Sequence, residues 1–325
     1  MFGLGIDYDR IKRRVHACDY LTVAQLFLKD NFLLERPLSF DDIKPRLLGH
    51  WGTCHGINVA YANLKAFYQN EYNKDDDFQF ILGPGHGFPA LQANLFIDGD
   101  LLKADPKAKR NLDGIKYICK NFSWPDGFPS HASPMTPGVI SEGGELGYAL
   151  GIAYGAALGH PERNIAVLIG DGEFETATAL SSMNLVKLFG TEKNGKVLPI
   201  LHLNGYKISA PTVYARKSER ELMSLIRGFG YTPIVVDGDD TEGFQIALEE
   251  TRDKAYENPF IIMKTAKGET GPEYVNGKKV EGNFLAHQIP LKEAKTDKEE
   301  LNILENWLKS YHFEELFNET EGFTL

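Results

Sequence analysis

The order of apolar and polar positions along the chain predicts an α/β protein. Short apolar runs, rich in β-branched residues, indicate buried strands at residues 78–82, 164–169, 198–204, 233–236 and 260–264. Apolar residues at helical spacing indicate helices at residues 20–32, 56–69, 218–227, 242–256 and 297–311. Strands that alternate with helices in this way are typical of a doubly wound, mostly parallel sheet flanked by helices.

The same pattern divides the chain into three parts. Residues 1–75 are predicted to form a helical segment that packs on the core, 76–290 the α/β domain, and 291–325 a helical tail. The acidic run at 75–77 is predicted to be a solvated connection near the first boundary.

Two segments inside the α/β domain have less regular patterns. Residues 98–137 contain many prolines and glycines, which indicates an ordered loop that crosses the surface. A helix is predicted to begin at Ser141 and to end at Gly159, with small side chains that allow close packing.

The most informative stretch runs from residue 164 to residue 208. A strand is followed by Gly170, Asp171 and Gly172, then by a helix-like segment, and then by a second strand that ends at Asn204. In open parallel sheets, ligands bind at the carboxyl ends of the strands, and here an acidic and an amide side chain would lie side by side. Hard oxygen donors beside a glycine turn and a helix N-terminus predict a Mg²⁺ or Ca²⁺ ion that holds a diphosphate.

Three histidines lie in loops rich in glycine, proline or serine, namely His50, His86 and His131. One of these loops directly follows a predicted strand, which favours convergence on one pocket, where imidazoles bind hydroxyl groups and transfer protons. A zinc site with His55 as the fourth ligand is the alternative, but the His, Cys and carboxylate spacing matches no known zinc pattern. Lys267, after the last predicted strand, is interpreted either as a phosphate ligand or as a solvated lysine.

Composition and charge exclude some classes of function. The chain has 325 residues, 42% hydrophobic and 25% charged, as in ordinary globular proteins. Its net charge of −10 argues against nonspecific binding to nucleic acid or to anionic membranes. Its three cysteines have no disulfide or metal-binding spacing, and neither a signal peptide nor a membrane span is predicted. A cytoplasmic location is therefore expected.

The motifs together resemble one family, the phosphoketolases, which are thiamine-diphosphate enzymes related to transketolase. The matching segments follow one another in order at residues 45–53 (PRLLGHWGT), 82–87 (LGPGHG), 129–131 (PSH), 142–148 (EGGELGY), 170–176 (GDGEFET), 198–208 (LPILHLNGYKI), 267–272 (KGETGP) and 286–291 (AHQIPL). The resemblance implies a thiamine-diphosphate-binding fold and a lyase that cleaves xylulose 5-phosphate or fructose 6-phosphate with inorganic phosphate. The products would be acetyl phosphate and a shorter aldose phosphate.

The resemblance also assigns roles to individual residues. The metal ligands would be Asp171, Asn204 and the backbone carbonyl of Tyr206. Residues lining the cofactor would be Gly144, Glu145, Leu146, Gly170, Gly172, Glu173 and Lys267. Catalysis and substrate binding would fall to His50, His86, His131 and His287, with Lys267 and Gln288 also binding substrate.

Only the diphosphate-binding domain of the family is matched. In the family a second, pyrimidine-binding domain carries the glutamate that activates the cofactor, so we expect a separately encoded partner subunit and a homo- or hetero-oligomer. The alternatives are a split transketolase-like enzyme, a non-catalytic binding or regulatory module, and the N-terminal part of a longer enzyme. The chain departs from the family pattern at Cys54-His55, Phe88, Ser141 and Glu269, which we expect to alter the substrate pocket.

Overall fold

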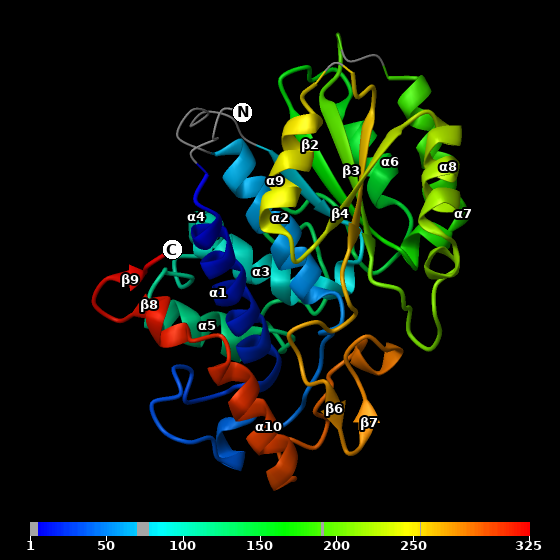
Figure 1. Cartoon of the computed structure of the whole chain (residues 1–325). Coiled ribbons are helices and arrows are strands. Elements are labelled where there is room, and N and C mark those ends of the chain that lie inside the picture. The colour runs from blue at the N-terminus through cyan, green and yellow to red at the C-terminus, as the bar shows by residue number, and fades with distance from the viewer. Residues whose placement is uncertain (1–5, 70–77, 190–191, 254) are drawn as a thin grey trace.

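A five-stranded parallel sheet forms the centre of the upper part of the molecule (Figure 1). The computed structural model describes residues 6–69, 78–189, 192–253 and 255–325. The strands lie in the order β1-β2-β3-β5-β4, with bounds β1 Gln79–Leu82, β2 Asn164–Gly170, β3 Lys196–Leu203, β4 Thr232–Asp237 and β5 Pro259–Lys264. All five predicted strands are present, and the predicted fold class is confirmed.

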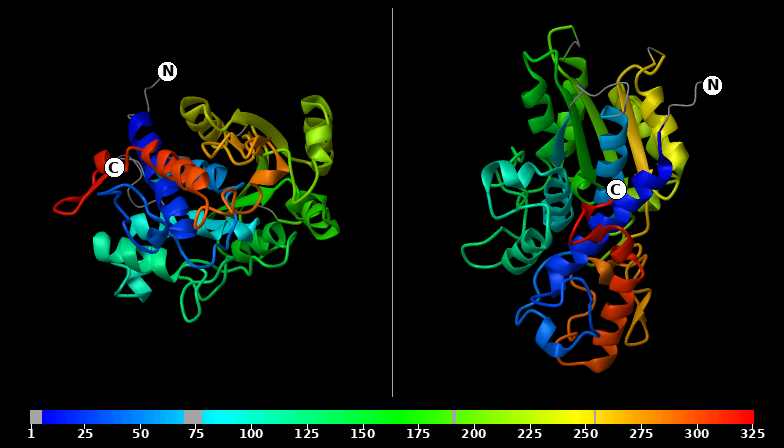
Figure 2. Two further views of the ribbon diagram at one scale, coloured as in Figure 1. Left: turned by 90° about the horizontal axis from the view of Figure 1, so that it is seen from below. Right: turned by 90° about the vertical axis from the view of Figure 1, so that its left-hand side faces the viewer.

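Helices cover both faces of this sheet (Figures 1 and 2). The helices are α1 Tyr8–Phe27, α2 Cys54–Tyr68, α3 Phe88–Asp98, α4 Asp100–Ala104, α5 Leu112–Asn121, α6 Ala149–Ala157, α7 Ala177–Ser182, α8 Glu219–Phe229, α9 Thr241–Glu250 and α10 Lys298–Lys309. Helices α1, α2, α3 and α9 share one hydrophobic core with one face of the sheet, and α6, α7 and α8 share a second core with the other face.

Side-chain alternation along the strands explains why the sheet separates two cores. In β2, Ile165, Val167 and Ile169 face the core of α6, whereas Ala166 and Leu168 face the core of α2. Because both faces are buried, the strand is a continuous apolar run rather than an alternating one.

The lower part of the molecule is built from segments far apart in sequence (Figure 2). It contains α10, the hairpin of β6 Tyr274–Val275 and β7 Lys278–Lys279, and the long connection between α1 and α2. The pair β8 Phe317–Asn318 and β9 Gly322–Phe323 closes the chain beside α1. The side chains of Trp51 and Trp307 pack edge to face with ring centroids 4.8 Å apart, which joins α10 to the loop before α2.

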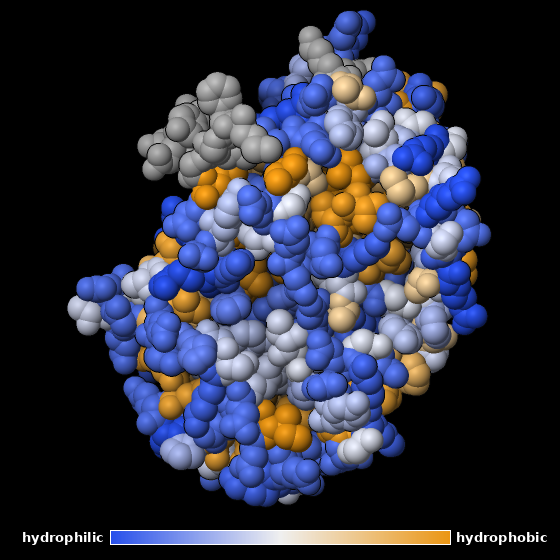
Figure 3. All heavy atoms as spheres, in the orientation of Figure 1, coloured by the Kyte–Doolittle hydropathy of each residue, from blue (hydrophilic) through white to orange (hydrophobic). Residues whose placement is uncertain are grey.

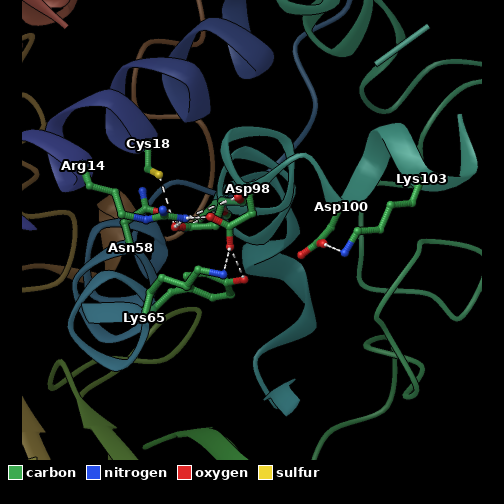
Figure 4. Close-up of polar contacts among 10 residues, drawn as sticks. Arg14, Cys18, Asn58, Lys65, Asp98, Asp100 and Lys103 are labelled. Carbon is green, nitrogen blue, oxygen red and sulfur yellow. Dashed lines mark hydrogen bonds and ion pairs between the residues drawn. The ribbon is translucent and has the colours of Figure 1, made fainter. Parts of the chain in front are cut away.

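A buried ionic cluster ties α1, α2 and α3 together (Figure 4). The carboxylate of Asp98 accepts from Arg14 at 2.7 Å and from Tyr61 at 2.9 Å, and it lies 3.1 Å from the Lys65 ammonium. Although burial opposes this, the two cations hold the pKa of Asp98 below its usual range. The cluster fixes the three helices against one another next to the sheet.

The prediction of a loop at residues 98–137 is wrong in part. Helices α4 and α5 lie inside it, and the side chain of Asn111 caps α5 by accepting from Gly114 N at 3.1 Å. Ile115 and Ile118 are fully buried at helical spacing, so a short amphipathic pattern was present among the glycines and prolines.

The helix predicted from Ser141 to Gly159 is also too long. Only α6, Ala149–Ala157, is helical, and residues 141–148 form a loop. Gly147 has φ +97°, in the left-handed region, so a helix cannot continue through this residue. A Cβ at Gly147 would also lie 2.1 Å from Thr176 Oγ1.

Smaller differences concern element bounds and domain division. Helix α1 begins at Tyr8 and ends at Phe27, earlier than the predicted 20–32. The segment after β2 is broken into α7 and a 3₁₀ turn at Met183–Lys187. The three-part division stays a prediction, and its first boundary and the acidic run fall outside the described residues.

The surface seen in Figure 3 is mostly hydrophilic, with apolar patches over both the upper and the lower part of the molecule. In the described ranges, no helix combines the length and apolarity needed to cross a bilayer.

Candidate active site

A cleft of about 480 Å³ opens where β1, β2 and β3 end. Each of these strands delivers a polar group to it: His86 after β1, Asp171 after β2 and Asn204 after β3. The rest of the lining is formed by His50, Thr53, Pro84, His131, Gly143, Gly144, Leu146, Gly170, Gly172, Glu173, Tyr206, Lys207, Ile208, Ser209, Lys267 and His287.

Asp171 lies at the end of β2 and is 2% exposed. Its carboxylate accepts from Gly205 N at 2.7 Å, from Gly172 N at 2.9 Å and from Thr212 Oγ1 at 3.1 Å. Burial raises the pKa of Asp171 to about 6, although these donors and Lys267 act in the opposite direction. The carboxylate is therefore rigidly held and responsive to a nearby cation.

Asn204 and Tyr206 complete a set of oxygen acceptors. Asn204 Oδ1 accepts weakly from Tyr206 N at 3.3 Å, and the Tyr206 carbonyl accepts from Lys267 Nζ at 2.6 Å. Carboxylate, amide and carbonyl oxygens are the hard ligands that Mg²⁺ and Ca²⁺ prefer. The chemistry of this set of oxygen atoms therefore fits such an ion. One of its members, the Tyr206 carbonyl, already faces a positive charge, that of the Lys267 ammonium.

Glu173 is a buried carboxylate that joins two loops of the cleft. It accepts from Gly170 N and from Gly147 N, each at 3.1 Å. Burial raises the pKa of Glu173 to about 7, since these donors compensate only partly for desolvation. The side chain thus connects the end of β2 to the 142–148 loop.

Direct contact between glycines brings the 142–148 loop against the turn after β1. A Cβ on Gly85 would lie 2.1 Å from the Gly143 Cα, so there is no room for a side chain at either of these two glycines. Ala132 bridges the two loops, because its N donates to Gly85 O at 2.9 Å and its O accepts from Gly143 N at 2.8 Å. This packing presents Gly144 and Leu146 to the cleft.

Four imidazoles cluster on the other side of the cleft. The ring centroid of His50 lies 4.9 Å from that of His86, 5.1 Å from that of His287 and 5.5 Å from that of His131. His50 Nδ1, His86 Nε2 and His287 Nδ1 are buried without a hydrogen-bond partner among the described residues. Such nitrogens are available to a ligand.

The imidazoles of this cluster are neutral near pH 7. Burial, together with neighbouring imidazoles and Lys267, lowers the pKa of His50 to about 4 and that of His287 to about 3. The same causes place the pKa of His86 well below its usual value, and burial alone lowers the pKa of His131. Neutral imidazoles both donate and accept hydrogen bonds, which suits hydroxyl recognition and proton transfer.

A comparison with protein families identifies the family to which the chain belongs. The family model described as "XFP N-terminal domain" matches residues 6–258 and 247–324. The chain belongs to the phosphoketolase family. It is 46% identical over 321 residues to a "Probable phosphoketolase" of Rhodopseudomonas palustris (strain HaA2), covering 93% of this chain and 40% of the relative. A "Probable phosphoketolase" of Chlorobaculum tepidum is 43% identical over 330 residues, covering 96% of this chain and 41% of the relative.

This phosphoketolase-family chain therefore spans about two fifths of the length of the curated relatives it matches. Its fold is that of transketolases. The transketolase from Leishmania mexicana superposes with a TM-score of 0.62 at 19% identity, covering 95% of this chain and 45% of that one. The Campylobacter jejuni transketolase gives a TM-score of 0.61 at 18% identity, with 94% and 47% covered.

Most site residues predicted for this phosphoketolase relative meet in the cleft. Glu145 and Gln288 do not line it, and both side chains are exposed, so their roles stay predictions. His55 also lies outside the lining, with its Nδ1 2.7 Å from Asp19, and among the described residues it does not share a set of side chains placed to hold a metal ion with His50, His86 or His131. The predicted roles of the residues that do line the cleft are likewise not settled by their position.

Several residues that line the cleft were given no role by sequence reasoning, among them Thr53 and Lys207. Thr53 lies between the His50 loop and α2, and its hydroxyl bonds the buried His202 ring at 3.1 Å. Lys207 follows the predicted metal-binding carbonyl and forms an ion pair with Glu175. A basic residue so close to Asn204 at a strand end was the signal that could have identified Lys207.

Proposed function

We propose that the chain is the metal- and diphosphate-binding subunit of a thiamine-diphosphate-dependent phosphoketolase-like enzyme. The enzyme would cleave xylulose 5-phosphate or fructose 6-phosphate with inorganic phosphate, giving acetyl phosphate and an aldose phosphate. One observation carries the proposal: a single cleft combines the oxygen donors of Asp171, Asn204 and Tyr206 with four neutral imidazoles.

The oxygen donors and the neighbouring loops would hold the cofactor. Asp171, Asn204 and the Tyr206 carbonyl would bind Mg²⁺ or Ca²⁺, and the ion would hold the diphosphate. Gly144 and Leu146 line the same cleft and would contact the cofactor. When bound, thiamine diphosphate supplies a nucleophilic carbon and an electron sink for carbon–carbon cleavage.

The imidazoles and Lys267 would act on the sugar phosphate. His50, His86 and His287 have unpaired ring nitrogens that can bind sugar hydroxyls and move protons at those oxygens. Lys267 is 2% exposed, and burial lowers its pKa to about 8, so it remains charged at neutral pH next to Asp171. Positioning and charge complementarity would provide much of the catalysis.

A second domain would supply the glutamate that activates the cofactor. Among the described residues, the carboxylates that line the cleft are Asp171 and Glu173, and backbone N–H groups already occupy both. The glutamate that activates the cofactor would therefore come from a pyrimidine-binding domain, which we propose is a separately encoded partner in a hetero-oligomer.

Calorimetry tests the cofactor site. The wild-type chain is titrated with thiamine diphosphate in Mg²⁺, with and without the partner, and compared with Asp171→Ala. We expect Mg²⁺-dependent binding that Asp171→Ala weakens at least 100-fold, because the metal loses its anionic ligand. Asp113→Ala, which removes an exposed carboxylate of α5, is the matched control and should bind normally. Wild-type binding that does not depend on Mg²⁺ or on Asp171 would reject the site.

Product analysis tests the reaction. The chain is mixed with its partner, thiamine diphosphate, Mg²⁺, phosphate and a ketose phosphate. Acetyl phosphate supports the phosphoketolase reaction. Cleavage with transfer to an aldose instead of phosphate would indicate a split transketolase-like enzyme. Cofactor binding without any cleavage would indicate a non-catalytic binding module.

A further inference from the structure

We propose that His55, Asp239 and Glu269 form a binding site for a divalent transition-metal cation, with Zn²⁺ as the best fit. One ligand atom from each of the three residues lies within 4.8 Å of the others. His55 is in the first turn of α2, Asp239 lies between β4 and α9, and Glu269 follows Lys267 in the turn after β5. None of the three lines the cleft described above.

The imidazole of His55 is oriented as in many metal sites. Its Nδ1 pairs with Asp19 Oδ2 at 2.7 Å, and Asp19 is completely buried. The other oxygen of Asp19 accepts from Asn58 Nδ2 at 2.7 Å, which fixes the carboxylate. A carboxylate that accepts from one ring nitrogen sets the tautomer and leaves Nε2 as the metal ligand.

The two carboxylates are close to each other and to His55. Glu269 is half-buried, and its Oε2 accepts from Ala266 N at 2.9 Å, which leaves Oε1 free of that bond. The exposed carboxylate of Asp239 gives a cation a path from solvent.

The ligand set selects the kind of metal. An imidazole nitrogen with two carboxylates suits Zn²⁺, whereas Mg²⁺ favours an all-oxygen octahedron. Tetrahedral zinc with ligands at about 2.0–2.2 Å separates neighbouring ligand atoms by about 3.4 Å, so the three side chains need only a small closure. Water would complete the coordination.

Two of these residues lie where the chain departs from the family pattern. His55 and Glu269 were expected to alter the substrate pocket, but they lie outside the cleft and face each other. The Glu269 turn is bonded to the loop before α2, since Gly268 N donates to Gly52 O at 2.8 Å and Trp51 Nε1 donates to Gly268 O at 3.2 Å. A metal ion would therefore connect the start of α2, the turn before α9 and the turn that carries Lys267.

Metal titration of the chelator-treated full chain tests the proposal. Zn²⁺ is added in saturating Mg²⁺, so that the predicted diphosphate site is occupied, and bound zinc is measured by calorimetry and elemental analysis. We expect one Zn²⁺ per chain. Glu269→Gln should weaken binding at least 10-fold and His55→Ala at least 100-fold. Asp19→Asn should weaken it about 10- to 100-fold, because Asp19 acts through His55.

Controls separate this site from the cleft. Glu269→Gln keeps an oxygen that can accept from Ala266 N, and circular dichroism checks that each variant folds. His131→Gln and Asp171→Ala alter the cleft and should leave Zn²⁺ affinity unchanged. Cobalt substitution should give a visible spectrum that Glu269→Gln changes. Zinc binding that is absent, or that is lost in His131→Gln but kept in Glu269→Gln, would overturn the proposal, and neither result would affect the cofactor site tested with Asp171→Ala.

Discussion

The two sides of the cleft differ in how their polar groups are held. The oxygen side consists of Asp171, Glu173, Asn204 and the Tyr206 carbonyl, and the histidine side consists of His50, His86, His131 and His287. On the oxygen side, both carboxylates accept backbone N–H groups. On the histidine side, three ring nitrogens are buried and have no hydrogen-bond partner in the part of the chain that the structure describes. In the proposed function, the oxygen side would hold a charged ligand in one place, and the histidine side would bind the hydroxyl groups of the sugar phosphate.

Lys267 lies between the two sides and acts differently on each. Its charge stabilises the Asp171 carboxylate, whereas it opposes protonation of His50, His86 and His287. The Lys267 ammonium thus favours the anionic form of Asp171, and it adds to burial in favouring the neutral form of the three imidazoles. The following experiments break or sharpen this contrast, from the largest expected effect to the smallest.

Gly85→Ala should disturb both sides at once. The new Cβ would lie 2.1 Å from the Gly143 Cα, so backbone must move between the His86 turn and the 142–148 loop. We expect a loss of about 3 kcal/mol in the free energy of unfolding, measured by urea denaturation, and loss of cofactor binding. Gly144→Ala is the control, because its Cβ meets nothing within 4 Å and should change stability by less than about 0.5 kcal/mol. Equal stability of the two variants would contradict the packing argument.

Mild acid should destabilise the histidine side. The folded pKa of His287 is about 3 against about 6.5 in the unfolded chain, so the unfolded state binds the extra proton below pH 6.5. Its stabilising contribution is therefore present above pH 6.5 and is lost as the pH falls toward 3. When the pH falls from 7 to 5, the free energy of unfolding of the wild type should fall by about 2 kcal/mol more than that of His287→Gln. Urea midpoints in chelator measure this, and identical pH profiles would show that His287 is not neutral in the fold.

Lys267→Met should reduce the electrostatic difference between the oxygen side and the histidine side. Burial would still lower the imidazole pKa values, but removal of the ammonium should raise the pKa of His287 by about one pH unit, or about 1.4 kcal/mol. Proton NMR titration of the ring resonances measures this change. Lys264→Met, at the end of β5 and outside the cleft lining, is the control and should leave the ring titrations unchanged. An unchanged His287 titration in Lys267→Met would remove the proposed electrostatic link.

His55 shows how strongly neighbours determine the state of a histidine. His55 and His287 are buried, and the other cleft histidines are partly buried. Asp19 nevertheless raises the pKa of His55 to about 8 in spite of desolvation, whereas the cleft rings have each other and Lys267 as neighbours. The sequence grouped His55 with the histidines of the loops because it lies only five positions after His50. Helix α2 begins at Cys54, so the His55 side chain packs toward α1 and not into the cleft.

The oxygen side could be predicted from sequence because its parts are local. Asp171 and Asn204 end two apolar runs, and neighbouring parallel strands bring their carboxyl ends to one edge of the sheet. The five strands were predictable for the same reason, since apolar runs buried on both faces have a clear signal. Helix α5 was missed because its short amphipathic pattern is surrounded by glycines and prolines.

The arrangement and charge state of the histidine side depend on the tertiary structure and could not be predicted from the sequence. The sequence indicated that glycine-rich loops converge, but the distances among His50, His86, His131 and His287 result from packing of loops that lie far apart along the chain. Their neutral state and the separate environment of His55 follow from burial and from which charges end up nearby. By itself the sequence determined the strands, the glycine turns and the ligand types at the strand ends, because these depend on local pattern. Only the tertiary structure decided which side chains share a charge environment, because that depends on contacts between distant segments.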